Sequence, residues 1–175
     1  MREYVLKCKV EEVEKVMSDF INSIRCLMFE EDDFATFEIV RRDGFCAIIS
    51  SMYLGEDTCK IGYNLSELTD SGMKLFRRNL EERFPSARGF ANITWALLHE
   101  MGHFCTDIFV EENFDERDKM KEEVRQIADY VERQNAYFNL PTERLATNWA
   151  IRWMLTGNNS RKAKEFEKKF FACFE

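Results

Sequence analysis

Histidine is nearly absent from this 175-residue chain, which contains only two. Proline is equally rare, and no stretch rich in proline, glycine or serine divides the sequence, so we expect one domain spanning residues 1–175. No segment approaches about 18 uninterrupted apolar residues, and the charged N-terminus lacks the apolar region of a signal peptide. These absences argue against a membrane protein and favour a cytoplasmic location.

Paired cysteine motifs and excess positive charge are also missing. The six cysteines form no CxxC pair and no dense framework, so we expect reduced thiols rather than disulfides. The net charge is −7, which argues against a nucleic-acid partner, because affinity for phosphates comes mainly from lysine and arginine. The one basic cluster, "RKAKEFEKK", is interleaved with glutamates and is typical of a solvated helix face.

The first third of the chain predicts one helix and a small sheet. Apolar residues recur at three- and four-residue steps over 10–28, the period of an amphipathic helix. The period becomes two from residue 35, where Phe37 and Ile39 alternate with Thr36 and Glu38. An Asp-Gly dipeptide typical of hairpin turns follows, and residues 45–52 are the predicted returning strand. Residues 59–65 alternate in the same way. We therefore predict three antiparallel strands.

The rest of the chain has helical periodicity. The last candidate helix has Ser160 in the position of an N-cap. Strands grouped early and helices grouped late indicate an α+β fold, with an N-terminal helix, a three-stranded antiparallel sheet and a helical half, rather than a doubly wound sheet. The expected helices of that half cover residues 72–84, 88–105, 115–137, 141–155 and 160–174.

Both histidines lie within five residues, His99-Glu100-Met101-Gly102-His103. On a helix, residues four apart project from the same face, so the two imidazoles can reach one metal ion. Glu100 projects beside that point and can accept a proton from a water on the metal. Chance matches to this short pattern occur, but two histidines on so apolar a helix would otherwise need buried polar partners.

A catalytic zinc ion usually has three protein ligands, so the two histidines need a third donor. The candidate is Glu143 at the start of the helix predicted over 141–155, where Ala146 and Ala150 on the same face would let another helix approach closely. The other interpretation is that Glu143 merely complements the N-terminal end of its own helix dipole.

The two segments together resemble the zinc metallopeptidases called gluzincins, in which two histidines of HExxH and a downstream glutamate bind the metal. "LLHEMGHF" is followed by "TERLATNWAIRW", which is similar to the third-ligand pattern E-x-x-A-[DN]-x-[FW]-A of the compact branches. Those branches include minimal gluzincins and the metallopeptidases of phages and mobile elements. Glu143, Ala146, Trp149 and Ala150 match, whereas Thr147 stands where these families usually have Asp or Asn.

The resemblance implies a single zincin-like domain that hydrolyses peptide bonds in a cytoplasmic protein or peptide substrate. It implies Zn²⁺ held by His99, His103 and Glu143, with Glu100 as general base. Thr147 or the adjacent Asn148 would support a ligand histidine. The implied candidates for oxyanion stabilisation are Tyr137, Arg144 and Arg152, and those for a substrate-binding edge strand are Ile61, Gly62, Tyr63 and Asn64.

Two other interpretations remain open from the sequence. In one, zinc only stabilises a protein-interaction module or pseudopeptidase, and no hydrolysis occurs. In the other, the chain is a structural α+β protein without a metal.

Overall fold

The computed structural model describes residues 7–25, 36–41, 49–52, 59–64, 77, 84–106 and 114–174. These residues are mostly helical. A short 3-10 helix, Pro85–Ala87, precedes the longest run of helices. The α-helices of the described residues are α1 (Val10–Asn22), α3 (Asn92–Cys105), α4 (Phe114–Arg125), α5 (Tyr130–Asn139), α6 (Pro141–Leu155) and α7 (Asn159–Ala172).

The sheet has three strands, β1 (Phe37–Arg41), β2 (Ile49–Met52) and β3 (Cys59–Tyr63), in the order β1-β3-β2. Strand β3 pairs in parallel with β1 and antiparallel with β2. The predicted α+β fold with an antiparallel sheet is therefore wrong, because the sheet is mixed and the described chain is mainly helical. The hairpin signal failed because β3 takes the place between the two strands that the Asp-Gly turn was expected to pair.

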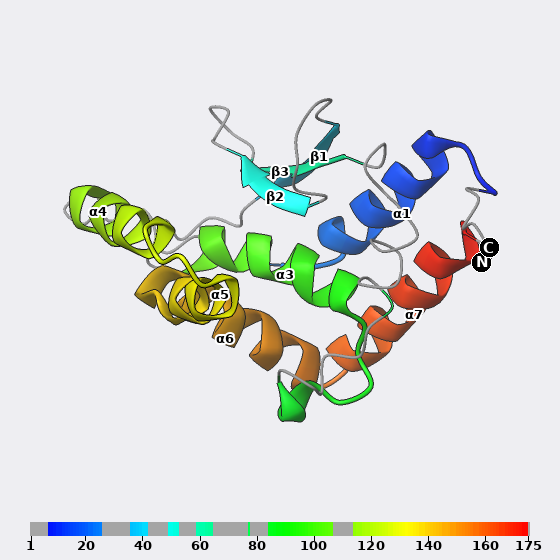
Figure 1. Ribbon diagram of the computed structural model, residues 1–175. Coiled ribbons are helices and arrows are strands. Elements are labelled where there is room, and N and C mark those ends of the chain that lie inside the picture. Colours follow the sequence, from blue (N-terminus) through cyan, green and yellow to red (C-terminus); the bar gives the residue numbers. More distant parts are fainter. Residues whose placement is uncertain are drawn as a thin grey trace.

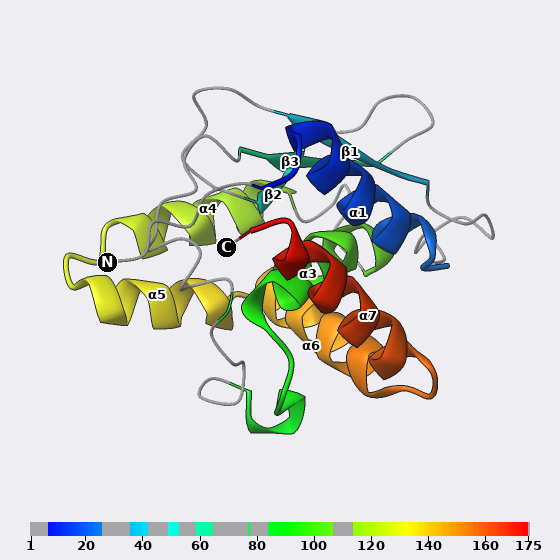
Figure 2. The same ribbon diagram turned by 90° about the vertical axis from the view of Figure 1, so that its right-hand side faces the viewer.

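Helix α3 forms the centre of the molecule (Figure 1). It contacts β2 and β3 on one side and packs closely along α6 on the other. Helix α1 lies against β1 and beside α7, as the second view shows (Figure 2). This arrangement explains why α3 is apolar almost all round, since it has packing partners on several faces and nine of its 14 residues are buried.

Two of the predicted helices differ from those observed. The helix expected over 115–137 is two helices, α4 and α5, because the carboxylate of Asp129 accepts a hydrogen bond from the Glu132 N–H and caps the start of α5. Helix α7 begins one residue before Ser160, with Asn158 as its N-cap residue. The helix expected over 72–84 falls mostly outside the described residues, as do residues 42–48 of the expected turn and returning strand.

The prediction of reduced thiols is confirmed for three of the described cysteines and is wrong for a fourth. Cys8, Cys59 and Cys173 are free, whereas Cys105 at the end of α3 is disulfide-bonded. Within the part of the chain that the structure describes, no helix has both the length and the apolar character that crossing a membrane requires.

Candidate metal centre

Helix α3 carries both histidines to the same place. His99 and His103 are one helical turn apart, and their ring centroids are separated by 4.6 Å in an edge-to-face arrangement. His99 is 5% exposed and the side chain of His103 is 14% exposed. The predicted projection of both imidazoles from one helix face is therefore observed.

Helix α6 supplies the carboxylate. Oε2 of Glu143 lies 3.1 Å from Nε2 of His99 and 3.4 Å from Nε2 of His103. One donor atom from each of the three side chains lies within 4.8 Å of the others, and Glu143 is 1% exposed. The three predicted ligands thus form a buried group that could hold a metal ion.

The electrostatics of Glu143 suit this role. Burial by itself raises the pKa of the carboxyl group, but hydrogen bonds from His103 and then His99 outweigh burial and hold the pKa below its usual range. The carboxylate therefore stays ionised in the interior. An ionised carboxylate beside two imidazoles is a donor set that zinc prefers.

The second imidazole nitrogen of His99 also has a partner. Its Nδ1 lies 3.1 Å from Oγ1 of Thr147, one turn along α6 from Glu143. Thr147 is 8% exposed, whereas the neighbouring Asn148 is exposed. Of the two residues predicted to support a histidine, Thr147 makes the contact.

Two aromatic side chains pack against the imidazole of His99. The Trp95 ring centroid lies 4.8 Å from that of His99, and the Phe138 centroid lies 6.4 Å from it. Trp95 and Phe138 also contact each other. This cover reduces access of water to His99, and it was not predicted, because Phe138 reaches the site from α5.

Glu100 and Tyr137 lie beside the three-residue group without belonging to it. Burial raises the pKa of Tyr137, and the negative charges of Glu143 and then Glu100 raise it further. The Tyr137 hydroxyl therefore stays protonated at neutral pH and can donate a hydrogen bond. The other two candidates for oxyanion stabilisation, Arg144 and Arg152, are exposed on α6. Tyr137 is the candidate that lies close to Glu143.

The strand predicted to bind substrate, β3, lies in the middle of the sheet. Residues Ile61, Gly62, Tyr63 and Asn64 are all buried. Strand β3 also has a neighbour on each side, so it offers no edge to which a peptide could add. The alternation of residues 59–65 predicts a strand with one open face, but Gly62 and Asn64 of that face are buried and Lys60 is partly buried.

Two contributors to the site were missed in the sequence. Gly102 lets the helices meet, because a Cβ atom there would lie 2.7 Å from the carbonyl oxygen of Ala146. A glycine within an apolar helix is a visible signal of such an approach. Lys121 on α4 has its Nζ 3.4 Å from Oε1 of Glu143. No sequence signal marks Lys121, because it lies among alternating charges on a solvated helix.

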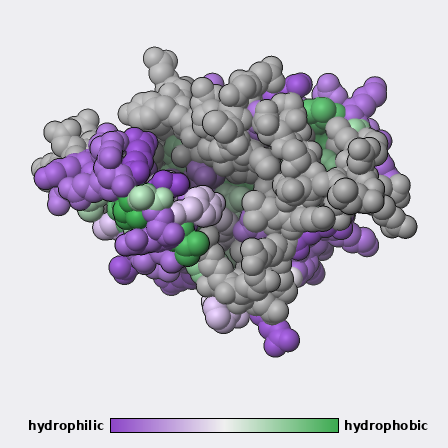
Figure 3. Space-filling view, viewed as in Figure 1, coloured by the Kyte–Doolittle hydropathy of each residue, from purple (hydrophilic) through white to green (hydrophobic). Residues whose placement is uncertain are grey.

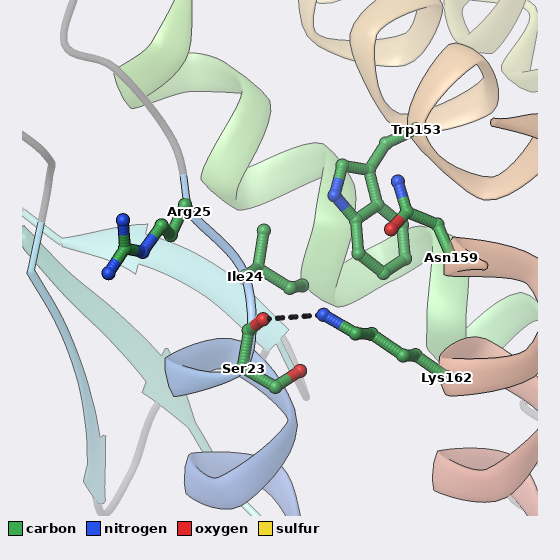
Figure 4. A pocket seen from close by; sticks show the side chains of 6 residues that line it. All are labelled: Ser23, Ile24, Arg25, Trp153, Asn159 and Lys162. Atoms are coloured by element: carbon green, nitrogen blue, oxygen red, sulfur yellow. Dashed lines mark hydrogen bonds between the residues drawn. The ribbon is translucent and has the colours of Figure 1, made fainter. Parts of the chain in front are cut away.

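A separate pocket of about 430 Å³ lies near the other end of α6 (Figure 4). Lys162 Nζ donates a hydrogen bond of 3.0 Å to the Ser23 carbonyl across it. Trp153 in its wall is ten residues beyond Glu143, roughly 15 Å along the helix. The pocket therefore shares no residue with the metal group. It is lined by Ser23, Ile24, Arg25, Trp153, Asn159 and Lys162.

No protein-family model, curated protein or solved structure matches this chain. Its function must therefore be inferred from the chemistry of His99, His103, Glu143 and the residues around them.

Proposed function

We propose that the protein is a zinc-dependent metallopeptidase that hydrolyses peptide bonds in a protein or peptide substrate. The observation that carries the proposal is the buried convergence of His99, His103 and Glu143, with Glu100 next to His99 on the same helix. Two imidazoles and one carboxylate are the ligand set of catalytic zinc sites that keep a position open. The resemblance of the two motifs to gluzincins supports the same reaction class.

Zinc in such a site activates water and polarises the scissile carbonyl. The residues of this chain supply the proton transfers. The Glu100 carboxylate accepts a proton as the water oxygen bonds to the carbonyl carbon, and it then passes that proton to the nitrogen as the C–N bond breaks. Tyr137, whose hydroxyl stays protonated, donates a hydrogen bond to the oxygen on which negative charge develops.

The test compares wild type with Glu100→Gln after both have been supplied with zinc. We expect equal zinc content and equal thermal midpoints, because Glu100 is not one of the three converging residues. Cleavage of a fluorescently labelled unfolded protein should fall by about 10²–10⁴-fold, since the amide cannot accept a proton. Glu165→Gln, which alters an exposed carboxylate on α7, is the matched control and should cleave as wild type does.

Two results would contradict the proposal. One is the absence of bound metal in wild type after zinc is supplied, measured by elemental analysis. The other is unchanged cleavage by Glu100→Gln. Zinc binding by a wild type that cleaves nothing would favour the zinc-stabilised interaction module instead.

A further inference from the structure

The two oxygens of Glu143 face different partners. Oε2 is the atom directed at both imidazoles, 3.1 Å and 3.4 Å from their Nε2 atoms. Oε1 is buried and accepts no hydrogen bond from the described residues, but the Lys121 ammonium lies 3.4 Å from it. The metal-facing oxygen and the lysine-facing oxygen are thus distinct.

Lys121 reaches this carboxylate from outside the pair of helices that carries the ligands. Helix α4 packs against α5, which in turn packs against α6. The surface over α4 and α5 is largely hydrophilic, as the left side of Figure 3 shows. The Lys121 side chain is nevertheless only 28% exposed, and its Nζ lies 6.0 Å from the centre of the Tyr137 ring. The lysine is therefore directed inward from a solvated helix.

Such a contact differs from a surface ion pair. Exposed pairs are weakened by solvent and salt, but Glu143 is 1% exposed, so its charge is poorly screened. A buried carboxylate oxygen without a hydrogen bond is costly unless a positive charge lies beside it. The Lys121 ammonium provides that charge at Oε1.

We propose that Lys121 is a positioning residue that makes Glu143 bind the metal through Oε2 alone. The inference rests on the proposed metal site. A carboxylate can bind a metal through one oxygen or both, and a cation at Oε1 favours the first arrangement. Binding through one oxygen leaves a coordination position free for water or substrate, which a catalytic site requires.

Cobalt(II) in place of zinc tests this directly, because its visible absorption bands lose intensity as the coordination number rises. In Lys121→Met, which keeps the chain length and removes the charge, both Glu143 oxygens should bind. We expect these bands to weaken by roughly twofold or more, because band intensity follows the coordination geometry. Added azide, which perturbs the spectrum by taking a free position, should perturb it less in this variant.

Three further variants complete the experiment. Lys121→Gln removes the charge in a second way and should behave like Lys121→Met. Lys121→Arg keeps the charge and should restore the wild-type spectrum. Lys119→Met removes an exposed lysine from the same helix and should leave the spectrum and the azide response unchanged.

The inference is overturned if both charge-removing variants give the wild-type spectrum and azide response. It is also overturned if the two charge-removing variants bind no cobalt. His99, His103 and Glu143 are unchanged in these variants, so a residue that only positions Glu143 should not abolish binding. Failure of the proposed function is recognised separately, since wild type would then either bind neither cobalt nor zinc or bind zinc without cleaving the unfolded protein.

Discussion

The hydroxyl of Thr147 can serve His99 with the imidazole in either neutral tautomer. Without a metal, Nε2–H of His99 can donate to Oε2 of Glu143, and Nδ1 accepts from the threonine hydroxyl. If a metal bound Nε2, Nδ1 would carry the proton and donate to Oγ1. An Asp carboxylate could only accept, so threonine can pair with His99 whether or not a metal is bound.

At the scale of the single residue, we predict that Thr147→Val weakens zinc binding by about 10–100-fold, because the ring of His99 loses its orienting partner. Valine has nearly the same shape, so packing around this buried position is preserved. Competition with a chromophoric chelator measures the affinity. Thr147→Ser keeps the hydroxyl and should bind within a few-fold of wild type, and equal affinities for the valine and serine variants would contradict the prediction.

At the scale of the helix, the contact between α3 and α6 is set by backbone rather than by side chains. Gly102 meets the carbonyl oxygen and the Cα atom of Ala146, and a Cβ atom there would lie 2.7 Å and 2.9 Å from them. Contacts below 3.0 Å with backbone cannot be relieved by a rotamer change. The helices must be this close for the short side chain of Glu143 to reach both imidazoles.

We therefore predict that Gly102→Ala destabilises the metal-free protein by about 1–3 kcal/mol, through forced separation of the two helices. Urea unfolding followed by circular dichroism measures the change. Helix propensity has the opposite sign, since alanine within a helix is favoured over glycine by about 0.5–1 kcal/mol. An increase in stability would show that the two backbones can move apart freely.

The start of α3 depends on a carboxylate from α7. Oε1 of Glu167 accepts hydrogen bonds from the Ala91 N–H at 2.6 Å and from the Thr94 hydroxyl at 2.7 Å. Glu167 is 7% exposed. The side chain satisfies a backbone donor at the N-terminus of α3, where negative charge is also favourable.

We predict that Glu167→Ala lowers the free energy of unfolding by about 1–3 kcal/mol, the cost of leaving a buried donor without its acceptor. Glu165→Ala is the control, because Glu165 is exposed and its ion pair with Arg161 spans one turn of the same helix. Its effect should stay within about 0.5 kcal/mol. Chemical denaturation measures both, and equal effects would remove the assigned role of Glu167.

At the scale of the whole molecule, a bound metal would join α3 to α6 at the centre of the fold. A ligand that binds only the folded state stabilises it by an amount that grows with its free concentration. Zinc at about a thousand times its dissociation constant would add roughly 4 kcal/mol. For a chain of this size we expect the thermal midpoint to rise by roughly 8–16 °C.

Thermal unfolding with zinc and with a chelator measures this rise. The same comparison on His103→Ala should show a much smaller one, because one of the three donors is lost. Identical midpoints for wild type under both conditions would argue that no metal binds the folded protein. The result does not depend on any enzymatic activity.

The sequence alone determined the features that arise within one helix or from the shape of one side chain. The four-residue spacing of His99 and His103 places them on one face of any helix, and the apolar surroundings of that helix indicate burial. The small residues after Glu143 pointed to a close helix contact. The shared helix face of His99 and His103 was therefore predictable from local geometry. Glu143 was identified as the third donor through the resemblance of its helix to the gluzincin pattern.

Only the tertiary structure decided which segments meet. Alternation identifies a strand but not its neighbours, so the central position of β3 and its parallel pairing with β1 could not be read from residues 37–65. The contact of Lys121 with Glu143 depends on how α4 and α5 turn back over α6. Neither result follows from local propensity, because strand pairing and helix placement depend on contacts between residues far apart in the chain.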